Sequence, residues 1–370
     1  MINGLYINDN APLRASIVNM GDMSRMKAVI AKARAGEPIT LGFLGGSITA
    51  GSGSGEGRSY VECVTDFWSE TFPECSVTCV NAGIGATGSI LGVFRMEKDV
   101  LASKPDVLVI DHSVNDNGDE IKAPGSTRMT YESVIRRGIL SGAAVVPLCF
   151  CERSGNSQRN MNLEIARHYD LPFISMVDGI YEPLVKSGKY EWSAYSGDSV
   201  HPNAMGHSMV GELIANYIRT VMADEADFST DKKELPAPLF GDAYMNTEML
   251  DGSSLIPDEY GAFEVGDLNF WQFKGGWRTE QGGSAMTFSL KRCKIVYLAF
   301  VRSVWEDSGT ATVRVGDVTY SIDTYFKNGW GNFAQTIKIF DSDEPQDITV
   351  SITPNDAGKK FGLLRVMVAR

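Results

Sequence analysis

From about residue 39 to residue 222, the sequence alternates short apolar runs with amphipathic stretches. Continuous runs of valine, isoleucine and leucine are typical of strands buried on both faces of a parallel sheet. The stretches between them have helical spacing, as in the apolar stripe that runs from Val210 to Val221. This alternation predicts right-handed crossovers and a three-layer α/β/α sandwich. We expect its strands at residues 39–44, 77–80, 107–111, 144–150 and, more weakly, 172–175.

The pattern changes after residue 222. Residues 223–240 are dense in charge and proline, which predicts a linker. Beyond it, short runs separated by turn signals such as Gly316-Asp317 predict strands and no helix of useful length. We therefore expect one domain at 1–222 and a second, all-β domain at 241–370, built as a sandwich or jelly roll. Its expected strands cover residues 285–290, 295–301, 311–315, 319–322, 336–340, 347–352 and 363–368.

Composition narrows the classes of partner. The chain has 370 residues, 43% hydrophobic and 22% charged, which is ordinary for a globular protein. A net charge of −12 repels polyanions, so we expect no nucleic-acid partner. No apolar stretch approaches the roughly 20 residues of a membrane span, so we expect no membrane partner. The amino-terminal residues show no secretory signal, and we interpret all six cysteines as reduced, which predicts a cytoplasmic protein. Cys149 and Cys151 lack the paired spacing of a zinc site, and we expect neither metal nor cofactor.

The first candidate for chemistry is Ser47. It follows an apolar strand that runs from Leu41 into Gly45 and Gly46. In an open α/β sheet, ligands bind beyond the carboxyl ends of the strands, which is where this serine would stand. The glycines let the backbone turn sharply and leave an N–H free to face an oxyanion. The alternative is that Ser47 only caps the helix that follows.

A second segment, Asp198-Ser199-Val200-His201-Pro202, favours catalysis. A serine hydroxyl needs a base to accept its proton, and the base needs a partner that fixes its tautomer. An aspartate three residues before a histidine in a loop can fold back to meet Nδ1, which leaves Nε2 facing the sheet edge. The alternative is a solvated Asp198 with a merely packed His201. We interpret the remaining histidines as structural, namely His112, His168 and His207.

Two further segments offer donors to a developing oxyanion. Ser113-Val114-Asn115-Asp116 follows the strand at 107–111, and Asn115 could present its side-chain amide. The glycine-rich segment 81–88 follows the strand at 77–80 and could present a backbone N–H. Removing one such donor typically costs about 10²–10³ in rate. Alternatively, Asn115 is a turn residue and the glycines form a tight strand–helix junction.

Together, these four segments resemble the sequence blocks of the SGNH (GDSL-like) hydrolase superfamily, whose fold is flavodoxin-like. The resemblance covers about residues 39 to 222. It implies an ester hydrolase in which Ser47 attacks, His201 is the general base and Asp198 orients it. It also implies that Asn115 and the Ser47 N–H belong to the oxyanion hole.

The chain departs from the family pattern at three places. The aspartate of the first block is Gly46 here, a change frequent among the glycan esterases of the superfamily. The third block begins with Ser113 rather than glycine. The donor of the second block falls on Ala86, with Gly85 beside it. An N–H donor needs no particular side chain, so both residues remain candidates.

The second domain favours a sugar substrate. Four of the six tryptophans lie in it: Trp271, Trp277, Trp305 and Trp330. Most tryptophans of a β-sandwich belong to its core, but Trp330 sits in the polar, glycine-rich segment 327–332 and could stack on a sugar ring, with Asn328 binding hydroxyls. Trp192 and Tyr195, just before Asp198, are candidates for a sugar platform near the catalytic loop.

This domain order resembles carbohydrate esterase family 17, the mannan acetylesterases, whose carboxy-terminal domain resembles a family 35 carbohydrate-binding module. The resemblance implies a carbohydrate O-acetylesterase whose partner is an acetylated oligosaccharide, with mannan the first choice. The alternatives are an SGNH esterase for a xylo-oligosaccharide, a lipid or a thioester, and a carbohydrate-binding protein without catalysis. Calcium in the β domain also stays open, with Asp251 and Asp258 as possible ligands.

Overall fold

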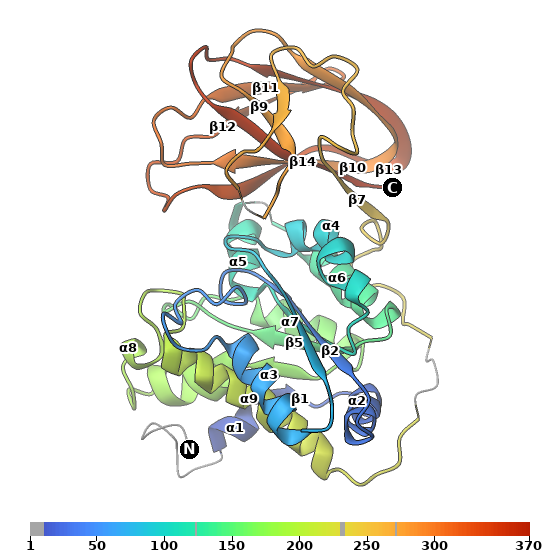
Figure 1. Cartoon of the computed structure of the whole chain (residues 1–370), viewed down its shortest axis with the longest axis vertical. Coiled ribbons are helices and arrows are strands. Elements are labelled where there is room, and N and C mark those ends of the chain that lie inside the picture. Colours follow the sequence, from blue (N-terminus) through green and yellow to red (C-terminus); the bar gives the residue numbers. More distant parts are fainter. Residues whose placement is uncertain (1–10, 123, 230–233, 271) are drawn as a thin grey trace. The chain divides into compact units, whose positions relative to one another are not determined.

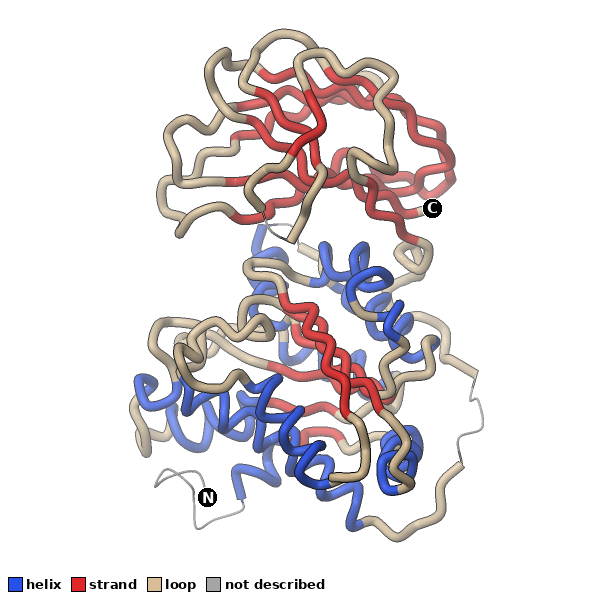
Figure 2. Tube along the Cα trace, viewed as in Figure 1, coloured by secondary structure: helices blue, strands red, loops and turns tan. Residues whose placement is uncertain are grey.

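The computed structural model describes residues 11–122, 124–229, 234–270 and 272–370. The chain forms two compact units, Met1–Asp242 and Ala243–Arg370 (Figures 1 and 2), and each is described by itself. Helices and strands alternate in the first unit, whereas the described part of the second consists of strands and loops. The predicted α/β architecture followed by an all-β domain is therefore confirmed.

A six-stranded sheet forms the centre of the first unit, in the order β1-β6-β5-β4-β2-β3. Five strands are parallel, and only β1 pairs antiparallel, with β6. β1 was not predicted. The strands are β1 (Ile17–Asn19), β2 (Ile39–Gly45), β3 (Val77–Gly83), β4 (Val107–Asp111), β5 (Ala144–Cys149) and β6 (Phe173–Ser175).

Helices cover both faces of this sheet. Figure 1 shows α3 and α9 on one side and α4 and α6 on the other. The apolar stripe of α9 is buried from Val210 to Val221, as its spacing predicts. The helices are α1 (Ala11–Ser16), α2 (Ser24–Arg34), α3 (Tyr60–Thr71), α4 (Ser89–Asp99), α5 (Ser113–Lys122), α6 (Arg128–Leu140), α7 (Arg159–His168), α8 (Trp192–Tyr195) and α9 (Ala204–Ala223), with a 3₁₀ turn at Leu101–Ser103 and a π-helical stretch at Val177–Lys186.

The register of the sheet aligns the carboxyl ends of three strands. Gly45 at the end of β2 lies opposite Gly83 of β3 on one side and Asp111 of β4 on the other. The segments that follow these strands therefore begin at one edge of the sheet. That edge is where ligands bind in open α/β sheets.

The segment predicted as a linker begins where α9 ends, at Ala223. Part of it is held to the first unit by the buried Glu132 of α6. The two carboxylate oxygens of Glu132 accept the N–H groups of Leu239 and Phe240 at 2.6 and 2.7 Å. Two backbone donors thus find acceptors, which fixes this stretch against the α/β unit.

The second unit is built from antiparallel strands in the order β12-β11-β13-β10-β14-β9-β8, with β7 paired to β14. The predicted strands at 285–290 and 295–301 are one strand, β10, and those at 336–340 and 347–352 are one strand, β13. The β10–β13 ladder continues because register shifts beside Arg292, whose φ is +52°, absorb the irregular residues. The strands are β7 (Thr247–Leu250), β8 (Glu264–Gly266), β9 (Gly276–Thr279), β10 (Met286–Arg302), β11 (Thr310–Val315), β12 (Val318–Asp323), β13 (Phe333–Pro354) and β14 (Phe361–Ala369).

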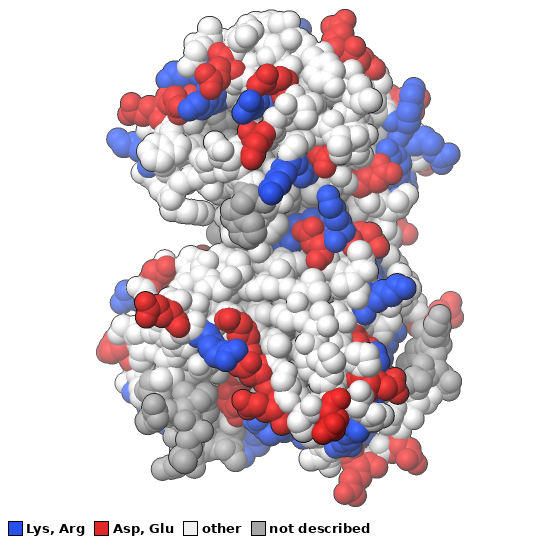
Figure 3. Space-filling model, viewed as in Figure 1, with Lys and Arg blue, Asp and Glu red and all other residues white. Residues whose placement is uncertain are grey.

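The surface carries charges of both signs. On the face that Figure 3 shows, acidic and basic side chains are interspersed over each unit. All six cysteines are free thiols. None of the helices in the described residues has both the length and the apolar character needed to cross a membrane.

Candidate active site

Ser47 stands in a tight turn directly after β2. The two preceding glycines are required by close contacts. A Cβ on Gly45 would lie 2.1 Å from the Thr49 hydroxyl, and one on Gly46 would lie 2.2 Å from Nδ2 of Asn115. The Asn115 amide therefore occupies the space that a side chain at position 46 would need, beside the nucleophile.

His201 reaches Ser47 from the loop before α9. Its Nε2 lies 2.9 Å from Ser47 Oγ, and its Nδ1 lies 2.7 Å from Oδ2 of Asp198. The structure thus brings the three predicted residues into one hydrogen-bonded chain. Such a chain lets the imidazole take the serine proton while the carboxylate stabilises the resulting imidazolium.

Asp198 is held by the loop itself. Its Oδ1 accepts the N–H groups of Val200 and His201 at 2.7 and 2.6 Å. Burial acts to raise the pKa of Asp198, but the hydrogen bonds from His201 and Val200 prevail and lower it below its ordinary value. Asp198 is consequently ionised at neutral pH, as its role requires.

The predicted sugar platform beside this loop is wrong. The side chains of Trp192 and Tyr195, at the two ends of α8, are only 5% and 2% exposed, because they pack into the hydrophobic core. Neither therefore offers a face to a sugar ring. Trp192 Nε1 instead donates to the carbonyl oxygen of Asp198 at 2.5 Å. The tryptophan thereby supports the backbone of the catalytic loop.

Two of the candidate oxyanion donors, Gly85 and Asn115, lie close to the Ser47 turn. Gly85 faces it, since a Cβ on Gly85 would lie 3.9 Å from the Ser47 Cβ. Asn115 Nδ2 donates to the carbonyl oxygen of Thr87 at 3.0 Å, which ties the asparagine to the same loop. Within the described residues, the N–H groups of Ser47, Gly85 and Ala86 donate to no protein acceptor. They are therefore free to bind an oxyanion.

The other three histidines lie in packed or structural positions. His207 stacks on Tyr60, and its ring nitrogens contact the Tyr60 N–H and the Ser52 carbonyl. His112 is fully buried; burial and the nearby Arg95 guanidinium lower its pKa to about 3, so the ring stays neutral. His168 Nε2 contacts the carbonyl oxygen of Ala237.

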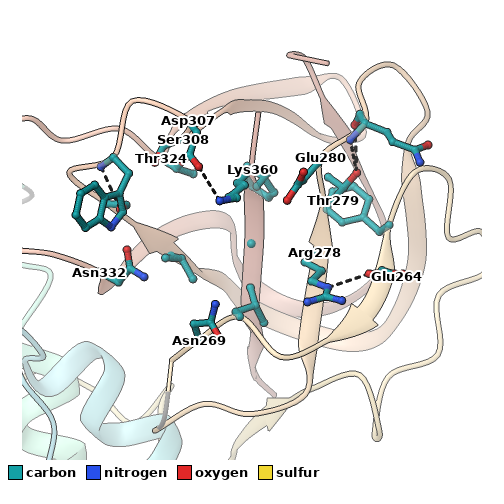
Figure 4. Close-up of a pocket in the computed structure, with 18 of the residues that line it drawn as sticks. Glu264, Asn269, Arg278, Thr279, Glu280, Asp307, Ser308, Thr324, Asn332 and Lys360 are labelled. Carbon is teal, nitrogen blue, oxygen red and sulfur yellow. Dashed lines mark hydrogen bonds and ion pairs between the residues drawn. The ribbon is translucent and has the colours of Figure 1, made fainter. Parts of the chain in front are cut away.

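The second unit carries a separate pocket of about 1050 Å³ (Figure 4). Its walls include two ion pairs, Lys360 with Asp307 and Arg278 with Glu264. Trp305 lines it and is 62% exposed, a candidate for ligand stacking that the sequence pattern did not single out. Asn332, at the end of the predicted Trp330 segment, also lines it.

The other aromatic candidates of the second unit differ in their exposure to solvent. Trp330 is 73% exposed and stacks on Phe333 with ring centroids 5.1 Å apart, and Asn328 is exposed as well. Trp277 is fully buried in the core, and Trp271 lies outside the described residues.

The described residues bring together no cluster of three histidine, cysteine or acidic side chains of the kind that holds a metal ion. The carboxylate of Asp251 accepts hydrogen bonds from Ser253, and that of Asp258 accepts one from Ser289. Both acids considered for calcium are thus engaged by neighbouring side chains.

Comparison with known proteins agrees with this geometry. The profile of the GDSL-like Lipase/Acylhydrolase family matches residues 43–209. A crystal structure of a two-domain esterase active on acetylated mannans, co-crystallised with mannopentaose, is 30% identical over 97% of this chain and 98% of that one, with a TM-score of 0.87.

A second structure of a two-domain esterase active on acetylated mannans is 29% identical, with the same coverage and TM-score. No curated protein matches the sequence. The chain belongs to the GDSL-like lipase/acylhydrolase family and is a carboxylic ester hydrolase.

Proposed function

We propose that this esterase is a carbohydrate O-acetylesterase that removes acetyl groups from manno-oligosaccharides through a Ser47 acyl-enzyme. The observation that carries the proposal is the hydrogen-bonded chain from Ser47 Oγ through His201 to Asp198, facing free N–H groups at one sheet edge. Hydrolysis of an ester by a serine needs this set of groups: a nucleophile, a base with a fixed tautomer, and donors for the oxyanion.

In the first half of the reaction, Ser47 Oγ attacks the acetyl carbonyl carbon while Nε2 of His201 takes the hydroxyl proton. The carbonyl oxygen becomes an oxyanion, which the Ser47 N–H, the Asn115 amide and an N–H of Gly85 or Ala86 stabilise. The tetrahedral intermediate collapses, and His201 returns the proton to the departing sugar hydroxyl. This leaves an acetyl ester on Ser47.

The second half repeats these steps with water. His201 removes a proton from a water molecule, whose oxygen attacks the acetyl-enzyme carbonyl. The same donors hold the oxyanion, and Ser47 Oγ leaves with the proton from His201. Acetate is released and the free enzyme returns.

The similarity to esterases active on acetylated mannans supports the choice of substrate, because it extends over both units rather than the catalytic unit alone. We test it by measuring acetate released from acetylated mannan and acetylated xylan oligosaccharides, each normalised to p-nitrophenyl acetate hydrolysis. We expect faster release from the mannan substrates. Equal, slow release from both, or faster hydrolysis of long-chain acyl esters or thioesters, would contradict the mannan assignment.

We further propose that the β unit binds the sugar chain. Two exposed indoles support this: Trp330, near Asn328 in the sequence, and Trp305, which lines the pocket of the β unit. Stacking on an exposed aromatic ring and hydrogen bonds from amides suit neutral sugars. The pocket also has more acidic than basic side chains, which disfavours an anionic glycan.

Replacing either indole separates sugar binding from chemistry. Trp330→Ala and Trp305→Ala are each expected to raise KM for acetylated oligosaccharides. Both should leave p-nitrophenyl acetate hydrolysis unchanged, because neither side chain belongs to the catalytic triad of Ser47, His201 and Asp198. The exposed Val318 of β12 offers a control, since Val318→Ala removes apolar surface away from both loops. A variant that loses activity equally on both substrates would show that its tryptophan supports the fold instead.

The free thiols support a reducing compartment as the working environment, and we propose the cytoplasm. Fractionation of the native host followed by an activity assay tests this placement. Activity found mainly outside the cell would contradict it.

A further inference from the structure

The loop between β3 and α4 carries an unusual backbone conformation. Ala86 has φ of +59°, in the left-handed region that alanine seldom adopts. Such a residue persists only where surrounding contacts hold it in place, and this arrangement is common at active sites. Its neighbour Gly85 faces Ser47, so the conformation of this loop decides where its free N–H groups point.

Three contacts fix the start and middle of this loop. The Ile84 N–H donates to the carbonyl oxygen of Gly45, and the Thr87 hydroxyl donates to the carbonyl oxygen of Ile84 at 2.7 Å. Asn115 Nδ2 then donates to the carbonyl oxygen of Thr87. None of these contacts reaches the end of the loop, where α4 begins.

Asp116 supplies that contact. It is fully buried in the first turn of α5, and its Oδ1 accepts the N–H of Ser89, the first residue of α4, at 2.6 Å. The residue before Ser89 is Gly88, which has no side chain to cap the helix. A Cβ at Gly88 would lie 2.4 Å from this carboxylate oxygen, so the glycine makes room for the carboxyl group.

We propose that Asp116 is a positioning residue for ester hydrolysis, which clamps the end of the 84–88 loop and thereby holds Ala86 in its left-handed conformation with the loop N–H groups facing the Ser47 oxyanion. Asn115 and Asp116 are consecutive in α5. The Asn115 side chain bonds the carbonyl oxygen of Thr87, and the Asp116 side chain bonds the N–H of Ser89. One helical turn therefore sets both the side-chain donor and the backbone donors of the oxyanion hole.

The mechanism makes no other use of this group. Oδ2 of Asp116 has no hydrogen-bond partner among the described residues. Burial raises the pKa of Asp116 well above its ordinary value, despite the opposing hydrogen bond from Ser89. An asparagine amide, which is neutral and keeps an acceptor at Oδ1, is consequently a close substitute.

The first test compares Asp116→Ala with Asp116→Asn on p-nitrophenyl acetate. We expect Asp116→Ala to lower kcat by about 10²-fold with little change in KM, because misplaced donors weaken transition-state binding and not substrate binding. Asp116→Asn should keep most of the wild-type kcat. A wild-type kcat for Asp116→Ala would overturn the proposal.

The second test uses the strained residue. Glycine adopts positive φ without the penalty that alanine has, so Ala86→Gly should restore the loop conformation when the clamp is missing. In the Asp116→Ala background we expect Ala86→Gly to raise kcat by about five- to thirty-fold. A purely structural helix cap predicts no such recovery, and its absence would contradict the clamp.

Two further variants keep the proposal falsifiable if Asp116→Ala folds poorly. Gly88→Ala disturbs the same contact from the loop side and should lower kcat to a similar extent. Asp106→Ala is the matched control: its Oδ2 accepts the Thr40 N–H at the opposite end of β2. We expect it to lower the Tm but not kcat. Equal kcat losses in Asp106→Ala and Asp116→Ala would show that Asp116 only stabilises the fold and would overturn the proposal.

The inference rests on the proposed role of Ser47 but not on the sugar substrate. p-Nitrophenyl acetate carries no sugar, so a failure of the mannan assignment leaves these kcat ratios unaffected. Wild-type activity in Ser47→Ala would contradict the proposed function itself, independently of the results for the Asp116 variants.

Discussion

Ser47→Ala is expected to lower kcat for p-nitrophenyl acetate by about 10⁶, since loss of a triad nucleophile removes the acyl-enzyme route altogether. The change deletes one oxygen, Ser47 Oγ, which lies 2.9 Å from His201 Nε2. The fold should therefore survive, with a Tm close to that of the wild type. Steady-state rates and thermal unfolding of the same preparation measure both effects.

Ser69→Ala is the matched control for this experiment. Ser69 is an exposed serine of α3 whose hydroxyl donates to the carbonyl oxygen of Thr65. Ser69→Ala removes a hydroxyl oxygen from the same unit without altering the catalytic triad. Mass spectrometry after a brief reaction should also find an added acetyl group in the wild type and none in Ser47→Ala. Retained turnover in Ser47→Ala would refute the serine mechanism.

The position of the catalytic triad could be predicted because it depends on the local pattern of apolar residues and on the topology of the sheet. Apolar runs locate β2 and β4, and parallel strands place the residues after them at one edge. Ser47 and Asn115 therefore meet, although they are 68 positions apart in the sequence. The spacing of Asp198 and His201 is itself local, so their contact follows from a single loop.

Burial of single aromatic residues could not be predicted in this way. Trp192 and Tyr195 stand beside the catalytic loop in the sequence, yet tertiary packing turns both rings inward. Trp330 is exposed while Trp277 is buried, although each follows a glycine directly. Alternation along one strand does not reveal which face of a bent antiparallel sheet meets the core.

Long-range hydrogen bonds were equally hidden. Asp116 belongs to a recognisable sequence block, but its partner, the Ser89 N–H, is 27 residues away on another helix. Two features of the sequence point to this contact. One is Gly88, which begins a helix without a capping side chain, and the other is the aspartate directly after Asn115. Neither signal identifies the other without the fold that joins α4 to α5.

Asp198→Asn is expected to lower kcat by about 10⁴ at neutral pH, because the amide imposes the wrong histidine tautomer. The new carbonyl oxygen can still accept the Val200 and His201 N–H groups that Oδ1 accepts now. The amide NH₂ then faces Nδ1, which must become an acceptor, so Nε2 carries the hydrogen and cannot take the Ser47 proton. The loop keeps its shape while the base is lost.

Asp224→Asn separates this effect from general loss of a carboxylate. Asp224 Oδ1 accepts the N–H of Ala226, two residues on, as Asp198 Oδ1 accepts that of Val200. It follows the far end of the 20-residue α9, roughly 30 Å of helix from the catalytic loop. We expect a small decrease in Tm and an unchanged kcat for this variant. An Asp198→Asn enzyme with wild-type kcat would show that His201 is oriented by the loop alone, and Asp198 would then have no catalytic role.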